Sequence, residues 1–214
     1  MTEEDILLID KPKGITSFDV IRRLRKGRGE RKMGHAGTLD PLASGLMIIG
    51  VGTGTKKLNE YIRLPKSYVA EILIGEKRST GDMEGEVVES AKVESLDKDE
   101  VEKALKEMVG VLRLPVPVYS AVKAGGKRLY KEVRKGRAVI IPLRDMETKN
   151  AQLLSMRKEG DYYIVEVEFD VESGVYIRSL AEELGRRLGY PATTKELRRT
   201  KIGDFRIEDA EKII

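Results

Sequence analysis

A loop near the start of the chain holds the residue best suited to chemistry. Residues 34–45 read Gly-His-Ala-Gly-Thr-Leu-Asp-Pro-Leu-Ala-Ser-Gly and include three glycines and the only histidine. Glycines let a backbone turn tightly and approach a ligand closely. Proline restricts the residue before it to extended conformations, so Asp40 lies on a stiffened turn that partly fixes its carboxylate. Asp40 is therefore a candidate catalytic carboxylate, although Asp-Pro also forms ordinary turns.

Two other side chains have types and surroundings that fit a catalytic site. Arg178 lies in the run Val-Tyr-Ile-Arg-Ser-Leu, at the start of an amphipathic pattern. A buried arginine needs a partner, and a carboxylate fits its planar group best. Such a pair can be purely structural, or it can hold a catalytic aspartate ionised by lowering its pKa. Tyr68 opens a predicted strand, where it either packs at the sheet end or stacks on an unpaired base.

The glycines within residues 50–54 resemble a nucleotide-binding loop in part. They follow the apolar run 46–49, as dinucleotide-binding glycines follow a strand. However, position 55 is threonine, so the third glycine is misplaced, and no helix of useful length fits before Pro65. The phosphate-loop pattern is also absent, because no Gly-Lys-Ser/Thr follows at the required spacing. We interpret these glycines as structural, and an oxidoreductase is the least favoured function.

The residue inventory limits the chemistry further. The chain has 214 residues, no cysteine and one histidine, with 40% hydrophobic and 36% charged residues. This composition is typical of a globular protein and excludes disulfides, thiolate catalysis and cysteine-ligated zinc. We expect no metal and no redox cofactor, so the chemistry falls to carboxylates, Tyr, Lys, Arg or Ser/Thr. The acidic start and the lack of a long apolar run predict a cytoplasmic protein without a secretory signal or membrane span.

Charge is segregated along the chain, although the formal net charge is only +4. Residues 11–32 and 123–144 each carry a net charge of +7, and residues 195–206 add +3, so the remainder is net acidic. This distribution is expected of a protein that presents one face to a polyanion such as nucleic acid. The alternative is a set of solvated lysine-rich faces.

Hydrophobic periodicity and capping residues predict the elements that position these residues. We expect strands over 6–9, 46–49, 67–74 and 162–169. One helix opens at Thr16 or Ser17 with Asp19 in its first turn. A second helix follows a capping box of Asp97 and Glu100. Its core face should carry Val101, Leu105, Met108 and Val109. A third carries apolar residues at 177, 180, 181, 184 and 188 and ends at Gly189.

The remaining segments complete the predicted fold. Residues 115–144 are basic and proline-flanked, which predicts a long protruding loop or hairpin of functional use. A turn at Gly203 and a short terminal helix close the chain. Because strands and helices interleave without a strict βαβ rhythm, we predict a single α+β domain over residues 1–214 with a mixed sheet.

Together these segments resemble one family, the bacterial tRNA pseudouridine-55 synthases (TruB family). The resemblance covers residues 8–205 and rests on six motifs in order. They are Asp-Lys-Pro-Lys-Gly-Ile-Thr-Ser (10–17), the loop 34–45, Lys-Ser-Tyr (66–68), Tyr-Ser-Ala-Val-Lys with Arg-Leu-Tyr (119–123 and 128–130), Gly-Val-Tyr-Ile-Arg-Ser-Leu (174–180) and Leu-Arg-Arg-Thr (197–200). The resemblance implies the pseudouridine synthase fold, a mainly antiparallel central sheet flanked by helices and loops.

The resemblance also implies an activity and a role for individual residues. The chain would isomerise the T-arm uridine of tRNA by base flipping, with Asp40 attacking either the uracil or the ribose. Tyr68 would stack on the flipped uracil and help remove its C5 proton, and Arg178 would pair with Asp40, joined by Asp82. His35 would contact RNA at the space left by the flipped base. The other implied contributors are Leu197 lining the pocket, Lys11 and Pro12 bracing the loop, and Lys66, Tyr176, Lys123 and Arg128 binding substrate.

Two departures from the family pattern qualify these expectations. Val116 replaces the first of two prolines before the Tyr-Ser-Ala run, a mild change in the expected RNA-clasping insertion at 115–144. Many members carry a further C-terminal RNA-binding domain, which we expect this chain to lack. Its affinity for tRNA should then depend on the basic stretches and on salt.

The expected partner is the tRNA T-arm stem-loop, and we predict a monomer that needs no membrane and no protein partner. Two rival functions stay open. A guide-RNA-dependent pseudouridine synthase subunit shares the catalytic loop, and a tRNA-binding folding helper with incidental catalysis would use the same surface.

Overall fold

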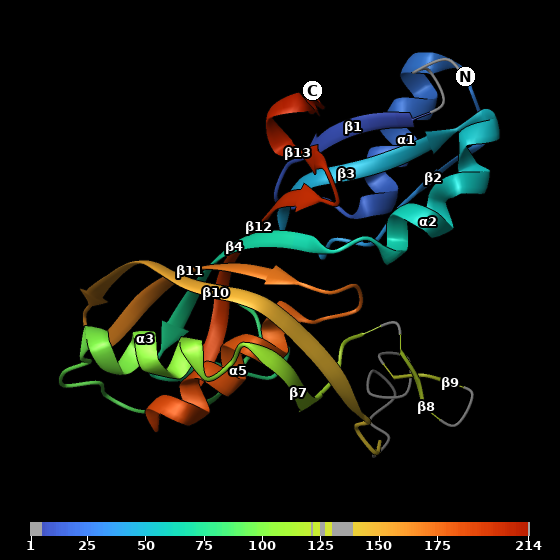
Figure 1. Ribbon diagram of the computed structural model, residues 1–214. Helices are drawn as coiled ribbons and strands as arrows, with labels where there is room; N and C mark the ends of the chain where they lie inside the picture. Colours follow the sequence, from blue (N-terminus) through green and yellow to red (C-terminus); the bar gives the residue numbers. More distant parts are fainter. Residues whose placement is uncertain (1–5, 121, 125–126, 130–138, 214) are drawn as a thin grey trace. The chain divides into compact units, whose positions relative to one another are not determined.

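The computed structural model describes residues 6–120, 122–124, 127–129 and 139–213 (Figure 1). It divides into two compact units. Unit 1 comprises residues up to Val69 together with those from Glu196 onward, and unit 2 comprises Ala70–Lys195. Strands β4 (Lys66–Ile74) and β12 (Ala192–Ile202) contribute residues to both units. The single catalytic domain over 1–214 stays a prediction.

Unit 1 is a mixed sheet with one long helix. Its strands follow the order β14-β1-β3-β12, with β2 on β3 and β13 on β12. β1 and β3 are antiparallel, whereas β3 runs parallel to β12 and β1 parallel to β14. The elements are β1 (Ile6–Lys11), α1 (Ser17–Arg28), β2 (Met33–His35), β3 (Ser44–Val51), η2 (Gly52–Lys57), α2 (Leu58–Arg63), β13 (Phe205–Arg206), η3 (Ile207–Asp209) and β14 (Glu211–Lys212).

β3 is the centre of unit 1 because it is buried on both faces. Leu46, Met47, Ile48 and Ile49 are all fully buried. Leu46 and Ile48 form a core cluster with Ala36 and Ile202, and the half-buried side chains of β1, α2 and β13 pack against it. Burial of each such side chain stabilises the fold by about 1.5–3 kcal/mol. The strand that follows the Asp40 loop is therefore a rigid support.

Helix α1 forms where the capping residues predicted it. Thr16 Oγ accepts a hydrogen bond from Asp19 N at 3.1 Å, and Thr16 N donates to the Asp19 carboxylate at 2.8 Å. This capping box satisfies backbone donors at the helix start. Val20 and Ile21 face the core, and Gly29 ends the helix with a left-handed φ of 72°. The predicted first helix is thus confirmed.

Two short helical segments precede Pro65, where we expected no helix of useful length. The 3-10 helix η2 and the six-residue helix α2 occupy residues 52–63. The glycines fold into this tight turn, where Thr55 Oγ donates to the Gly52 carbonyl at 2.8 Å. A Cβ on Gly50 would lie 2.9 Å from the Gly54 carbonyl oxygen, so this glycine is needed for packing.

Among its described residues, unit 2 has a mainly antiparallel sheet and the helices α3 and α5. Its strands follow the order β4-β11-β10-β7, and β10 pairs antiparallel with both β11 and β7. Helix α3 packs against β10 and α5 (Figure 1). The elements are β5 (Glu76–Arg78), β6 (Val87–Ser90), α3 (Lys98–Lys106), β7 (Gly110–Pro115), β8 (Lys123–Ala124), β9 (Lys127–Arg128), β10 (Leu143–Glu159), β11 (Tyr162–Val171) and α5 (Ile177–Leu188). Both units confirm the α+β class with a mixed, mainly antiparallel sheet.

Several predicted elements differ from the structure. Helix α3 ends at Lys106, and Val109 is 45% exposed, so this valine does not belong to the core face. The predicted terminal helix is wrong, because residues 207–212 form a short 3-10 helix and the strand β14, which pairs with β1. Within 115–144 the described residues include the small hairpin β8–β9, whereas residues 130–138 lie outside the described residues.

Candidate active site

The loop that carries Asp40 joins β2 to β3 in unit 1. Asp40 is half-buried, and its carbonyl accepts a hydrogen bond from Ala43 N at 3.1 Å. Its neighbour Leu39 is held on both sides by one hydroxyl, because Ser17 Oγ accepts from Leu39 N at 2.9 Å and donates to Leu39 O at 3.0 Å. The first turn of α1 therefore fixes the backbone just before the carboxylate.

Lys11 fixes the backbone just after the carboxylate. Its side chain is fully buried, and Nζ donates to three carbonyl oxygens, those of Ala43 at 2.6 Å, Pro12 at 3.0 Å and Pro41 at 3.4 Å. Gly14 N adds a hydrogen bond to Pro41 O at 2.8 Å. A buried ammonium requires such partners, and three carbonyls match its three donors. Lys11 thus ties the end of β1 to the turn that follows Asp40.

Arg199 is a third support of this loop, and its role was not predicted from the sequence. It lies in β12, is only 1% exposed, and donates from Nε to Leu46 O at 2.7 Å and from Nη2 to Gly37 O at 3.3 Å. Its backbone runs so close to β3 that a Cβ on Gly45 would overlap the Arg199 carbonyl oxygen. Residues 196–202 show no apolar alternation that would distinguish Arg199 from Arg198, and the pairing of β12 with β3 is what places Arg199 in the interior.

His35 ends β2 and lies on the same loop. Burial, followed by the positive charge of Arg199, lowers the pKa of His35 below its usual value of 6.5, whereas an interaction with the Gly37 backbone acts in the opposite direction. The half-buried imidazole is therefore neutral at neutral pH. A neutral ring can contact RNA by stacking and by single hydrogen bonds rather than as a phosphate-binding cation.

The pKa of His35 predicts a specific dependence of stability on pH. The unfolded chain gains a proton on His35 below about pH 6.5, whereas the folded chain gains it only at lower pH. The unfolded state then binds more protons, so the free energy of unfolding should fall from pH 7.5 to 5.5. His35→Gln should flatten this slope in urea unfolding. Because the chain has one histidine, an equal slope in the variant would contradict the prediction.

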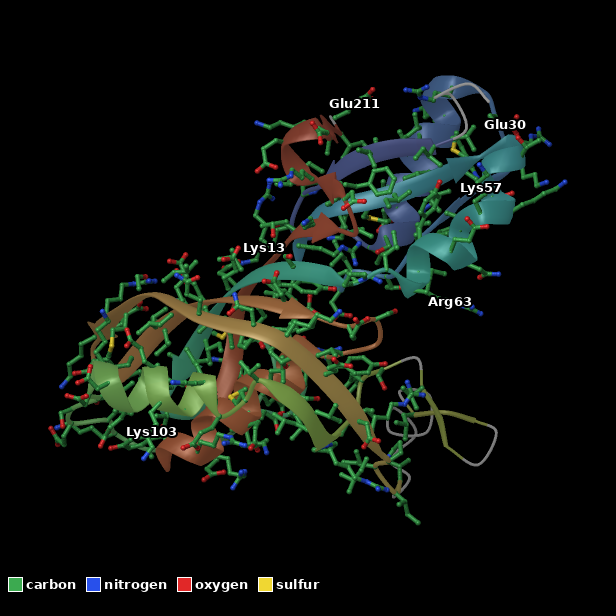
Figure 2. The ribbon with its side chains drawn as sticks, viewed as in Figure 1. Lys13, Glu30, Lys57, Arg63, Lys103 and Glu211 are labelled. Atoms are coloured by element: carbon green, nitrogen blue, oxygen red, sulfur yellow. The ribbon has the colours of Figure 1, made fainter. Side chains whose placement is uncertain are left out.

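The other predicted site residues of unit 1 occupy β4 and β12. Tyr68 is 9% exposed on β4, and Leu197 is half-buried on β12. Lys66 is buried at the start of β4, where its ammonium donates to Ile62 O at 2.6 Å and to Leu64 O. These contacts tie β4 to the end of α2. Lys13, which is labelled in Figure 2, forms an ion pair with Glu196 of the same unit.

Unit 2 brings together Asp82 and Arg178. Both side chains are buried, and Arg178 Nη1 lies 3.4 Å from Asp82 Oδ2. Arg178 also donates to Thr80 O at 2.9 Å and to Tyr119 O at 3.2 Å, while Asp82 Oδ1 accepts from Glu84 N at 3.1 Å and from Thr80 Oγ. Because the charges are paired and hydrogen-bonded, their burial is tolerated and their positions are fixed.

The other predicted site residues of unit 2 are Tyr176, Lys123 and Arg128. Tyr176 caps α5, is half-buried, and accepts hydrogen bonds at its carbonyl from Ser179 N and Leu180 N. Lys123 and Arg128 face each other across the β8–β9 hairpin, but their side chains lie outside the described part of the chain. Asp40 and Tyr68 belong to unit 1, whereas Asp82 and Arg178 belong to unit 2. The pairing of Arg178 with Asp40 therefore stays a prediction.

Across residues 6–120, 122–124, 127–129 and 139–213, no group of three or more His, Cys, Asp or Glu side chains is arranged to hold a metal ion. None of the helices in these ranges is long and apolar enough to cross a membrane.

Comparisons with known proteins agree on one family. Residues 25–177 match the model for the TruB family pseudouridylate synthase N-terminal domain. The tRNA pseudouridine synthase B of Corynebacterium efficiens is 41% identical over 206 residues, which cover 96% of this chain and 69% of the relative. The tRNA pseudouridine synthase B of Leifsonia xyli subsp. xyli is 40% identical and is matched over 100% of this chain and 72% of its own length.

Solved structures show the same fold. A chain in the structure entitled "Crystal Structure of a Cbf5-Nop10-Gar1 Complex" superposes with a TM-score of 0.72 at 28% identity. A chain of an H/ACA RNP bound to a substrate RNA containing 2'-deoxyuridine superposes with a TM-score of 0.70 at 26% identity. Each match covers 97% of the present chain, which spans about half the length of those solved chains.

Proposed function

Because the chain belongs to the TruB family of pseudouridylate synthases, we propose that it isomerises the uridine at position 55, in the T-arm of tRNA, to pseudouridine. The observation that carries the proposal is the immobilised loop around Asp40. Ser17, Lys11 and Arg199 hold its backbone from three directions, and the carboxylate stands at the only Asp-Pro step of the chain. Such support suits a group that must meet a reacting atom in a fixed geometry.

The proposed reaction conserves the atoms and electrons of the substrate. Asp40 attacks either the ribose anomeric carbon or the uracil ring, and the bond between N1 and the ribose breaks. The base then rotates, C5 bonds to the anomeric carbon, and the bond to Asp40 breaks to return the free carboxylate. The C5 proton leaves and N1 gains a proton. A carboxylate nucleophile must be ionised for this step. In the proposal, Arg178 pairs with Asp40 and holds it ionised and aimed, while Asp82 positions Arg178 through their ion pair.

Recognition of the base accompanies the chemistry. The target uridine must leave its stack, at a cost of about a few kcal/mol. In the proposal Tyr68 stacks on the flipped uracil and assists removal of the C5 proton, Leu197 lines the pocket, and His35 contacts RNA at the vacated space. The cationic and polar contributors to RNA binding are Lys66, Tyr176, Lys123 and Arg128, and Lys11 acts through the loop it supports.

We propose a monomer in the cytoplasm that binds the T-arm stem-loop without a protein partner. The two solved relatives carry titles that name protein or RNA assemblies, so a guide-RNA-dependent subunit is the rival with a specific observation in its favour. The relatives that match this chain over 69% and 72% of their own length are tRNA pseudouridine synthases, which argues against the guide-RNA-dependent subunit.

One assay decides between these functions. The purified chain alone is incubated with an unmodified tRNA transcript labelled with tritium at C5 of uridine, and released tritium is counted. We expect release of one equivalent, and none from a transcript with cytidine at position 55. No release from the first transcript would rule out an enzyme that acts alone and favour a guide-dependent subunit or a folding helper.

A further inference from the structure

Helix α1 presents an aromatic side chain to solvent. Phe18 is 54% exposed, although it lies in the first turn of a helix whose other apolar residues face the core. The guanidinium carbons of Arg22 and Arg25 lie 6.0 Å and 5.8 Å from the centroid of its ring. Residues spaced by three and four share one face of a helix, so these three side chains form a single aromatic and cationic surface.

The arginines of this surface are held in place by the fold. Arg25 Nη2 donates to Met33 O at 3.2 Å, and Arg22 pairs with Asp19 of the capping box. Ser17, the residue before Phe18, carries the hydroxyl that binds Leu39 beside Asp40. The surface therefore begins one residue from the support of the catalytic loop, and its geometry is preorganised.

The rest of the helix adds positive charge. Arg23 and Lys26 are exposed on α1, and Arg31 and Lys32 are exposed just beyond it. Within the described part of the chain, none of these four side chains has a carboxylate partner, whereas Arg28 Nη2 lies 3.7 Å from Glu211 Oε2. Unpaired cations next to an exposed ring are the arrangement by which proteins bind unpaired nucleotides, since the ring stacks on a base and the cations neutralise phosphates.

We propose that α1 is a second RNA-binding surface, on which Phe18 stacks on an unpaired base of the substrate while Arg23 and Lys26 contact the flanking phosphates. The inference rests on the proposed function in one respect, that the substrate is RNA. It concerns a different nucleotide from the one at Asp40. A duplex offers phosphates but no free base face, so Phe18 selects for a loop.

The test measures affinity rather than turnover. Binding of a T-arm stem-loop RNA is followed by fluorescence anisotropy for the wild type and for Phe18→Ala, Phe18→Leu and Phe18→Tyr. We expect the Ala and Leu variants to raise Kd about tenfold, as loss of one base stack does, and the Tyr variant to stay within about twofold. Leu154→Ala, which truncates an exposed apolar residue of unit 2, is the matched control and should leave Kd unchanged.

Two further arms separate stacking from charge. A blunt duplex with the stem sequence but no loop should bind the wild type and Phe18→Ala equally. The double variant Arg23→Ala with Lys26→Ala should bind both RNAs more weakly and reduce the slope of log K against log salt by about two. These changes would support the proposed phosphate contacts.

Several results would overturn the inference. Wild-type affinity in Phe18→Ala would exclude Phe18 from the RNA surface, and wild-type affinity in Phe18→Leu would replace stacking by simple apolar contact. Equal loss of duplex binding in Phe18→Ala would exclude selection for an unpaired base. Affinity losses confined to the stem-loop, in a protein that releases no tritium, would uphold this inference while the proposed enzyme activity fails.

Discussion

Asp40→Asn is expected to reduce tritium release by at least about 10³-fold, because the amide cannot act as the carboxylate nucleophile. The Asp40 backbone is held through its carbonyl and through Leu39, and neither contact involves the carboxylate. Because asparagine matches aspartate in size and its amide oxygen can still accept a hydrogen bond, the variant should fold, and it should bind the T-arm stem-loop with a Kd close to that of the wild type. Single-turnover release and anisotropy measure the two quantities on the same protein.

The matched control is Asp204→Asn, which makes the same chemical change at an exposed residue of unit 1. It should leave both turnover and binding at the level of the wild type. Tritium release by Asp40→Asn at the rate of the control would remove Asp40 from the chemistry. A variant that loses binding and turnover together would instead assign Asp40 to the recognition of RNA.

Gly45→Ala is expected to destabilise the protein by at least about 4 kcal/mol, or to prevent folding. Gly45 has a φ of 108°, and a methyl group there would overlap backbone atoms of Arg199 on the parallel strand. Backbone atoms in paired strands cannot move aside as a flexible side chain can. The strands β3 and β12 would have to separate, which would release the Arg199 contacts with the Asp40 loop. Urea unfolding measures the loss.

Gly14→Ala separates the two causes of destabilisation, which are the strain of a positive φ and the overlap with neighbouring backbone atoms. Gly14 has a similar φ of 88°, but no atom lies within 4 Å of the added methyl group. It should therefore show the backbone strain alone, about 1–3 kcal/mol. Equal destabilisation in the two variants would show that close packing of β3 against β12 contributes nothing beyond the strain.

Local features of the sequence were sufficient for several elements. A cap at Thr16 or Ser17, Asp19 in the first turn and the apolar spacing predict α1, and Gly189 predicts the end of α5. These features act within a few residues, where sequence alone defines the interaction. The motif loop around Asp40 was also identified from composition, although the residues that hold it come from three distant segments.

Features that depend on distant pairing could not be predicted in this way. β10 extends over 17 residues with only Met146 and Thr148 fully buried, so its hydrophobic pattern is weak and its hydrogen bonds to β11 and β7 define it. β14 exists because it pairs with β1. Arg198 and Arg199 are identical neighbours, yet one pairs with Asp10 and the other enters the core. Only the register of β12 distinguishes them.

Unit 1 is assembled from two segments of the chain that flank the whole of unit 2. Arg199, which holds Gly37, and Arg198, which holds Asp10, both belong to the later segment. During synthesis, domains fold as their residues emerge from the ribosome. Before residues 196–214 are synthesised, the loop around Asp40 therefore lacks the hydrogen bond from Arg199 to the Gly37 carbonyl. A nascent chain cannot complete the loop around Asp40 until residues 196–214 have been translated, and contacts over such separations make this folding step slow.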